Sequence, residues 1–290
     1  MSTVPRWLST GVVVVRFYVL RSLALDVGTW RMRAWPARSR ERFLMSKAWA
    51  LAHLALGRPA SVVVSGIRLR VTTAADLGTL QTVLSDVHDE LVVPGLVPTA
   101  TPVVVDVGAN IGQFTAAVKA FWPRASVRAF EPDPDVHAVL ADNARRLGGV
   151  ATRAVALGAR ASSLPLHRHH LSSMSTLRPG LVETYDAARA VLVPVVRLDD
   201  QTADLGAVDL LKVDVEGYEV EVLRGATDLL RRTRLLLVEV SLARSGSSTE
   251  PDVLAAVAAV RPAATVVGRG RPIGGADAPI CQDVLIDLGD

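Results

Sequence analysis

The feature that most constrains the fold is the segment VVVDVGANIGQFTAAV, residues 103–118, in which a β-branched run and a glycine turn precede a helical pattern. That order builds a ligand crevice in an open α/β sheet, because ligands bind beyond the carboxyl ends of parallel strands. Gly108 permits a sharp turn at positive φ, and Gly112 lets the first helical turn approach a ligand closely. Asn110 stands where a dinucleotide-binding turn carries its middle glycine. We therefore expect a nucleoside ligand that lacks a pyrophosphate.

Strand and helix patterns alternate from this turn to the C-terminus. Strands are predicted at Val103–Val107, Ser126–Phe130, Ala151–Leu157, Val208–Val213, Leu235–Val240 and Ala264–Val267, with helices over about Gly112–Phe121 and Asp135–Leu147. Such alternation predicts an α/β fold with a doubly wound, mostly parallel, Rossmann-like sheet. The last segment, Asp283–Asp287, alternates with acidic residues, which predicts an antiparallel strand at the edge of the sheet.

Three parts of the chain are distinguished by their patterns. Residues 1–58 are expected to form a basic, helical N-terminal extension. Residues 59–102 are expected to form a hairpin around Ser65-Gly66 and a helix over Ala74–Val93, leading through a proline-punctuated linker into the core. Residues 103–290 are expected to form the ligand-binding domain.

Charge and cysteine content narrow the compartment and the class of protein. The formal net charge is +3, but the first 60 residues carry ten Arg and Lys against two acids, which leaves −5 for the remainder by difference. A single cysteine, Cys281, excludes an intrachain disulfide and a cysteine-based zinc cluster. No signal-peptide pattern is present, and Arg16 and Arg21 interrupt the apolar stretch Gly11–Leu25, so we expect a cytoplasmic protein.

The basic N-terminal extension has two interpretations. It could provide an amphipathic surface for an anionic membrane, which would place the protein peripherally at the inner membrane face. It could instead form a lid that packs on the core with its arginines in solvent, and the large packing area of four tryptophans (Trp7, Trp30, Trp35 and Trp49) favours this second interpretation. No pattern resembles a nucleic-acid-binding module, so we expect no nucleic-acid partner.

Acidic residues at the ends of the first two predicted strands suit a nucleoside. Glu131 follows Asp106 by twenty-five residues, and a carboxylate at that point can accept hydrogen bonds from both ribose hydroxyls. Asp106 could hold the glycine turn through its amides or help to hold the ligand. Asn110 tolerates left-handed geometry, and its amide could also bind the ligand. Ala156, at the end of the third predicted strand, lies where such sheets meet an adenine ring.

A second motif, VDLLKVDVEGYEVEVLRGA, covers residues 208–226. Together with VVVDVGANIGQFT and AFEPDP, it resembles the FkbM family of S-adenosylmethionine-dependent methyltransferases, from about Val62 to the C-terminus. The resemblance implies a Rossmann-like class I fold, S-adenosylmethionine as the cofactor, and O-methylation of a hydroxyl on a sugar, glycolipid or secondary metabolite. Under this resemblance, Asp106, Gly108, Asn110, Gly112, Glu131 and Ala156 are the candidate cofactor-binding residues.

Methyl transfer to a hydroxyl requires alignment of donor and acceptor and a base for the hydroxyl proton. Asp214 is the first candidate for this catalytic base, followed by Glu216 and then Glu239 at the end of the next strand. Lys212 is expected to form a structural ion pair with Asp214 or Glu216. A divalent metal could instead acidify the hydroxyl, since clustered carboxylates suit magnesium, but no metal ligand set is indicated by the sequence.

Other polar residues after the third predicted strand are weaker candidates for a role in the site. The histidines are expected to lie in a solvated loop, the serines to position substrate or form turns, and the tyrosine to pack or contact substrate; these residues are His167, His169, His170, Ser172, Ser173, Ser175 and Tyr185. A different class of function is a non-catalytic methyltransferase-fold module that binds or scaffolds in a biosynthetic complex. A nicotinamide oxidoreductase is disfavoured by Asn110.

Overall fold

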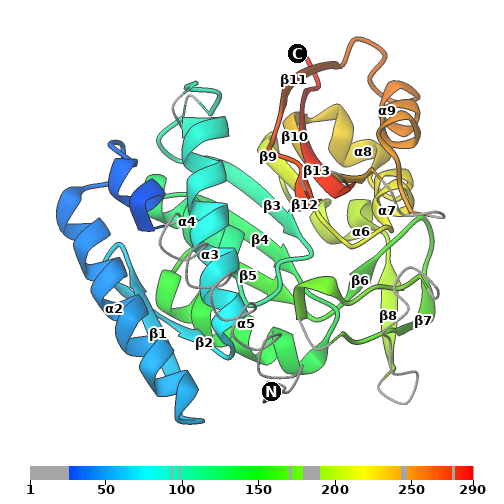
Figure 1. Ribbon diagram of the computed structural model, residues 1–290. Coiled ribbons are helices and arrows are strands. Elements are labelled where there is room, and N and C mark those ends of the chain that lie inside the picture. Colours follow the sequence, from blue (N-terminus) through cyan, green and yellow to red (C-terminus); the bar gives the residue numbers. More distant parts are fainter. Residues whose placement is uncertain are drawn as a thin grey trace, which may run out of the picture.

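The computed structural model describes residues 26–92, 94–97, 99–169, 172–178, 190–242, 247–275 and 278–289, and its centre is a twisted, mostly parallel sheet (Figure 1). In sheet order, its strands are β11 (Thr265–Arg269), β13 (Ala278–Asp287), β10 (Thr233–Ser241), β9 (Val208–Val213), β3 (Val103–Val107), β4 (Ser126–Phe130) and β5 (Val150–Arg153), and β12 (Ile273–Gly275) pairs with β13. The five strands from β10 to β5 are parallel. The predicted α/β, Rossmann-like fold class is confirmed.

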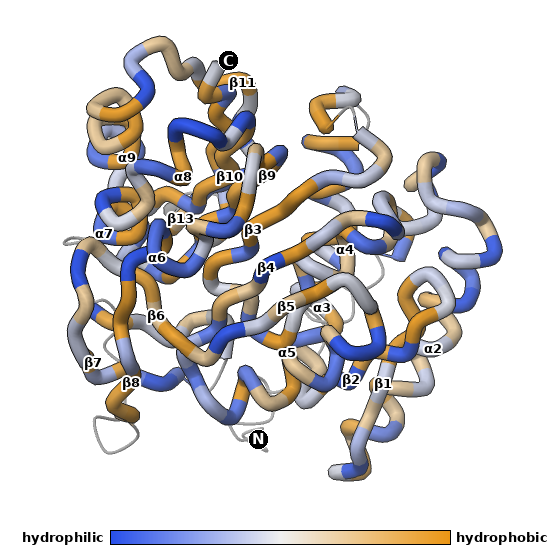
Figure 2. Tube along the Cα trace, turned by 180° about the vertical axis from the view of Figure 1, so that it is seen from behind, coloured by the Kyte–Doolittle hydropathy of each residue, from blue (hydrophilic) through white to orange (hydrophobic). Residues whose placement is uncertain are grey.

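Helices cover both faces of this sheet. One face is covered by α3 (Ala74–Asp86), its π-helical continuation η1 (Val87–Val92), α4 (Gln113–Phe121) and α5 (Pro134–Leu147), and the other by α6 (Leu198–Thr202), α7 (Glu219–Arg224), α8 (Thr227–Arg231) and α9 (Glu250–Ala258) (Figure 1). Successive strand residues point to opposite faces. Val104 therefore packs in the core beneath α4, and Val105 packs in the core beneath α7 and α8. This double burial explains why β3 is hydrophobic along most of its length (Figure 2).

The antiparallel strand β13 lies inside the sheet, so the prediction that it forms the edge was wrong. It pairs with β10 on one side and with β11 on the other. Val284, Leu285 and Ile286 are buried, because helices cover both faces at this point too. The acids that suggested an exposed edge lie at the two ends of this buried stretch. Asp283 lies opposite Glu239, and Asp287 caps the following turn by accepting a hydrogen bond from the backbone of Gly289.

The predicted third strand, Ala151–Leu157, divides into two strands of different sheets. β5 (Val150–Arg153) closes the main sheet. The chain then changes partners, and β6 (Ala156–Leu157) joins a three-stranded sheet with β8 (Val191–Val196) and β7 (Ser162–Leu166). The residues of this segment cannot reveal such a change, because the partner of β6 is the distant strand β8. Ala156 therefore belongs to the small sheet.

The described part of the N-terminal extension packs against the same core. Residues 26–31 are helical, α2 (Ala37–Ala55) packs on β1 (Ala60–Val64), and β1 turns into β2 (Ile67–Val71) through Ser65-Gly66, both at positive φ. Trp35 is fully buried and donates its indole N–H to Ser65 Oγ. Lys47 pairs with Asp26 at 2.6 Å and donates to Gln81 of α3. The hairpin and the helical extension were both predicted from the sequence.

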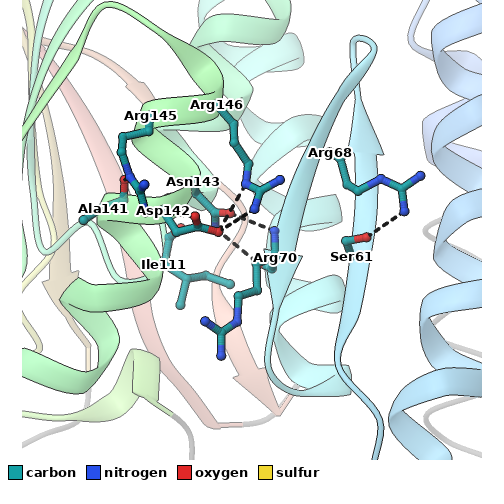
Figure 3. Close-up of polar contacts among 9 residues, drawn as sticks. All are labelled: Ser61, Arg68, Arg70, Ile111, Ala141, Asp142, Asn143, Arg145 and Arg146. Atoms are coloured by element: carbon teal, nitrogen blue, oxygen red, sulfur yellow. Dashed lines mark hydrogen bonds and ion pairs between the residues drawn. The ribbon is translucent and has the colours of Figure 1, made fainter.

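Asn143 on α5 ties this hairpin to the glycine turn (Figure 3). Its Oδ1 accepts from the backbone N–H of Arg70, and its Nδ2 donates to the carbonyls of Arg70 and Ile111 at 3.0 and 2.9 Å. Asn143 is only 2% exposed, so water does not reach these groups. Its side chain therefore satisfies backbone polar groups of both β2 and the glycine turn. The hairpin thereby becomes part of the support of the predicted cofactor loop.

Candidate functional site

The glycine turn after β3 has the geometry that its sequence predicts. Gly108, Asn110 and Gly112 all have positive φ, of 77°, 50° and 95°. The backbone N–H groups of Gly108 and Ala109 donate to the carbonyl of Phe130, which joins the turn to the end of β4. A Cβ on Gly108 would lie 1.7 Å from the backbone oxygen of Asp214. Glycine is therefore required here because the end of β9 lies against the turn.

Asp106 and Lys212 form a buried ionic support beneath this turn. Asp106 is fully buried, accepts a hydrogen bond from Thr115 Oγ1 at 2.7 Å, and has Lys212 Nζ 3.6 Å from its other oxygen. Lys212 also donates to the carbonyl of Gly108 at 3.0 Å and pairs with Asp214 at 3.2 Å. Burial raises the pKa of Asp106, and Lys212 opposes that shift. The predicted structural pairing of Lys212 with Asp214 is confirmed, and Asp106 supports the turn through this lysine.

Glu131 lies at the end of β4, where its backbone N–H donates to the carbonyl of Arg153 on β5. Its two carboxylate oxygens accept hydrogen bonds from the backbone N–H groups of Asn110 and Asp133, both at 2.9 Å. Each oxygen keeps a further lone pair for a ligand donor. Burial raises the pKa of Glu131 to about 7, although both backbone bonds lower it. The carboxylate thus fixes the glycine turn and remains available from the cavity that it lines.

One cavity at the carboxyl ends of β3, β4, β9 and β10 brings the two predicted groups of residues together. Its lining includes, among the candidate cofactor residues, Gly108, Asn110, Glu131 and Ala156, and, among the candidate catalytic residues, Asp214, Glu216 and Glu239. Asp106 and Gly112 are buried in the supporting turn and helix start instead.

Two amide side chains in the cavity wall retain unused donors. Asn110 accepts from Ser172 Oγ at 2.9 Å, but its Nδ2 is buried without a hydrogen-bond partner among the described residues. The same holds for Nε2 of Gln113, the first residue of α4, which is 5% exposed. Buried donors without partners are costly, so two in one wall indicate that a ligand with oxygen acceptors completes them. Gln113 was missed from the sequence because glutamine at a helix start carries no distinctive signal.

The three candidate catalytic carboxylates converge. One oxygen from each of Asp214, Glu216 and Glu239 lies within 4.8 Å of the others, an arrangement that could hold a divalent cation. Burial, with the neighbouring charges of Asp214 and Glu216, raises the pKa of Glu239 well above its usual value. Asp283 on β13 faces this group across the β10–β13 pairing, and burial raises its pKa to about 7. Asp283 was missed because its strand was predicted to lie at the edge.

The end of α3 and the helix η1 add acids to the cavity lining that the sequence did not single out. Asp86 at the end of α3 and Glu90 in η1 line the same space. Burial raises the pKa of Asp86 to about 6 and that of Glu90 to about 7. No glycine motif or strand end marks these residues, and only packing of α3 and η1 beside α4 brings them to the site.

The loop after β7 contributes through its serines and threonine rather than its histidines. Ser172 and Ser175 line the cavity. Among the described residues that line it, His167 and His169 do not appear. Thr176 Oγ1 donates to the backbone carbonyl of Glu216 at 2.7 Å, which anchors the loop beside the candidate catalytic carboxylates. Ser173 lies in a short 3₁₀ helix, and its side chain, like His170 and Tyr185, lies outside what the structure describes.

A glycine turn at the end of the central strand, an acid at the end of its neighbour, and a cavity that joins them define a Rossmann-like cofactor-binding domain. A family model described as the Methyltransferase FkbM domain matches residues 106–257, just over half of the chain. The chain belongs to the FkbM family of methyltransferases, as the sequence motifs predicted.

Several relatives share parts of this chain. Methyltransferase sdnD of Sordaria araneosa is 34% identical over 160 residues, which cover 44% of this chain and 62% of sdnD. The 2-O-methyltransferase NoeI of Sinorhizobium fredii is 27% identical over 53% of this chain and 69% of its own length. The 31-O-demethyl-FK506 methyltransferase FkbM of Streptomyces tacrolimicus is 33% identical over 48% of this chain and 65% of that protein. The chain thus spans less than two thirds of the length of sdnD.

Among solved structures, the chain is similar to Methyltransferase FkbM from Methylobacillus flagellatus KT. The TM-score is 0.47 and the sequence identity 18%, over 72% of this chain and 54% of that chain.

Proposed function

We propose that this protein is an S-adenosylmethionine-dependent O-methyltransferase that acts on a hydroxyl of a sugar, glycolipid or secondary metabolite. The observation that carries the proposal is the single cavity in which Gly108, Asn110 and Glu131 face Asp214, Glu216 and Glu239. A cofactor held by the first group would lie beside an acceptor held by the second. That arrangement suits methyl transfer, which chiefly requires the two to be aligned.

The residues present fit the proposed cofactor. Glu131 offers acceptor lone pairs for ribose hydroxyls, and the free amide donors of Asn110 and Gln113 suit a carboxylate. Gly108 lets the end of β9 lie against the turn, which brings Asp214 beside the proposed cofactor site, and Ala156 offers a small apolar surface for the base. When bound, S-adenosylmethionine supplies a methyl group on a positively charged sulfonium. The acidic wall of the cavity favours such a cation.

Removal of the acceptor's proton is assigned to the carboxylate cluster. Asp214 is the first candidate for the base, because its backbone touches the cofactor turn and its side chain, 36% exposed, lines the cavity. Glu216 and Glu239 are the next candidates. Should these three carboxylates bind magnesium, they would hold the metal while it polarised the acceptor hydroxyl, and one of the remaining acids would take the proton.

The acceptor class is supported by the names of relatives. NoeI is named a 2-O-methyltransferase, and the relative from Haloferax volcanii, AglP, is named a hexuronic acid methyltransferase. Another is named for the 31-O position of FK506. Two of these names state an oxygen position and the third a sugar acid, which supports a hydroxyl of a sugar or small molecule as the acceptor, and we propose no nucleic-acid partner.

We also propose a peripheral position at the inner membrane face, reached through the basic residues of the first 58 positions. Among the described helices, none combines the length and the apolar character that a membrane span requires.

Calorimetry tests the cofactor assignment. S-adenosylmethionine and S-adenosylhomocysteine should bind to the full-length chain, and NAD should not. Glu131→Ala should weaken cofactor binding, whereas Asp214→Ala should leave binding near wild type and lower turnover. Asp200→Ala, which changes an exposed acid of α6, is the matched control. Absence of S-adenosylmethionine binding would contradict the proposal. Binding with no methyl transfer to any hydroxyl acceptor class would favour the non-catalytic module instead.

A further inference from the structure

The outer face of α2 carries an uncovered apolar row. Met45, Trp49 and Leu56 are 76%, 47% and 66% exposed, and the alanines between them, Ala48 and Ala52, are exposed as well. Positions 45, 48, 49, 52 and 56 follow one side of a helix and its end.

The inner face of the same helix already packs on the core. Phe43, Lys47 and Ala50 are buried against β1 and α3, so the outer row is not a displaced part of the core. α2 also lies at the periphery of the molecule in both overall views (Figures 1 and 2). Single exposed apolar residues are ordinary, but a row of them on one peripheral helix marks an interaction surface.

Positive charge borders this row. Arg38 and Arg42 lie on the exposed side of α2 before it, and Arg58 lies beyond its end. Residues 37–58 are all described, and Glu41 is their only acid. Tryptophan, methionine and leucine flanked by arginines match the composition of helices that lie in the interface of anionic membranes.

A further exposed aromatic residue lies in the helix over residues 26–31. Trp30 is 54% exposed, and the guanidinium of Arg40 lies 5.6 Å from the centre of its ring. Residues 1–25, which precede this helix, contain three arginines and no acid. The sequence before this helix therefore carries only positive charge.

We propose that the outer face of α2 docks on an anionic lipid bilayer, with Met45, Trp49 and Leu56 in the interface and Arg38 and Arg42 against phosphate groups. This inference rests on the membrane contact proposed above and assigns it to a particular surface.

Charge argues against the other occupants of this face. A second copy of the chain would bring the same arginines together across a two-fold contact, because such an interface is self-complementary. Residues 1–25 would likewise add three positive charges to a positive surface. An anionic surface is the occupant that matches both the apolar row and its border.

Sedimentation of the full chain with vesicles tests the proposal. Binding should be strong to phosphatidylcholine vesicles that contain about 30% phosphatidylglycerol and weak to phosphatidylcholine alone. Arg38→Gln with Arg42→Gln should lower the affinity for anionic vesicles about tenfold or more, since each basic residue near an anionic surface adds several-fold. Met45→Ala with Trp49→Ala should lower it by about as much, since binding also scales with the apolar area buried in the interface.

Matched controls lie elsewhere on the surface. Leu192→Ala removes an apolar side chain of β8 that is 69% exposed, and Arg145→Gln with Arg231→Gln removes two exposed arginines of α5 and α8. These variants should bind vesicles within about twofold of wild type, because the removed groups lie outside the proposed contact. S-adenosylhomocysteine affinity should stay unchanged in all variants, which verifies their folding.

Three other results would each contradict a particular part of this proposal. If the wild-type chain binds neither vesicle, this inference and the proposed membrane contact both fail, while methyl transfer is untouched. If it binds anionic vesicles and the α2 variants bind equally well, only the assignment to α2 fails. If light scattering shows a dimer that Met45→Ala with Trp49→Ala converts to a monomer, the face is a contact between copies, and the inference is overturned.

Discussion

Lys212→Met should show how strongly one buried lysine supports the site. Lys212 is 8% exposed, and its Nζ lies 3.2 Å from Asp214, 3.6 Å from Asp106 and 3.0 Å from the carbonyl of Gly108. Methionine keeps most of the volume and removes the charge. Asp106 would then keep only its bond from Thr115 and would be a fully buried carboxylate without a counter-charge.

Removing one partner of a buried ion pair costs about 3–5 kcal/mol, because it leaves a desolvated charge behind. The hydrogen bond to the carbonyl of Gly108 is lost in the same substitution. Because it is coupled to the ion pairs, its energy is not fully additive with theirs. We expect Lys212→Met to lower the free energy of unfolding by about 3–5 kcal/mol at about pH 8.

The loss should depend on pH in a definite direction. Burial already raises the pKa of Asp106, and removal of Lys212 raises it further. For an acid whose folded pKa is raised, folding is unopposed below the unfolded pKa, and stability is lost as the pH rises through the folded value. The destabilisation should therefore shrink on acidification, by up to about 1.4 kcal/mol per pH unit.

Urea denaturation followed by circular dichroism at about pH 5.5, 7 and 8.5 measures this dependence. Lys119→Met is the matched control: Lys119 is also buried, at 6% exposure, but the hydrogen bond that the structure shows for it runs to the carbonyl of Ala125. That variant should lose less stability and show a nearly constant loss over this range. A loss for Lys212→Met that is independent of pH, or no larger than that of Lys119→Met, would refute the reasoning.

The remaining predictions concern the cofactor turn and the carboxylates. Gly108→Ala should abolish S-adenosylmethionine binding in calorimetry, because its Cβ would meet a backbone oxygen at 1.7 Å, whereas Gly57→Ala, at similar φ in open space, should cost only about 1–2 kcal/mol. Asn143→Ala should lower the melting temperature and weaken cofactor binding by releasing Ile111; unchanged affinity would contradict its role in the turn. Cofactor affinity should fall below about pH 7 as Glu131 takes up a proton, and Glu131→Gln should remove that dependence. EDTA should abolish turnover, with recovery on added magnesium, only if the clustered carboxylates bind a metal.

Local pattern was enough to predict the strands and helices around the cofactor turn. The predicted strands Val103–Val107, Ser126–Phe130 and Val208–Val213 have the observed bounds, because each is a short, mostly apolar segment that ends at a turn signal. Gly108 adopts the predicted positive φ, and Asn110 adopts the left-handed geometry that its residue type tolerates, for the same local reason. The relation of Glu131 to the turn also followed, since parallel strands end at one edge of a sheet.

Pairing between distant strands did not follow from local pattern. The predicted strand through Ala156 spans a change of sheet, which depends on the distant residues Val195 and Val196 as partners. β13 alternates like an exposed strand, yet it inserts between β10 and β11. Its burial depends on which helices cover the sheet, and no residue within the strand records that.

The sequence by itself determined the family, the cofactor turn and three carboxylates of the site, because these lie in short motifs whose chemistry is local. Only the tertiary structure decided which further acids line the cavity, since Asp283, Glu90 and Asp86 reach it from strands and helices far apart in the chain. It also decided what Asp106 does, because only the fold places Lys212 between that acid and the carbonyl of the turn. Burial and long-range pairing set these roles, and neither is a property of a residue's neighbours in sequence.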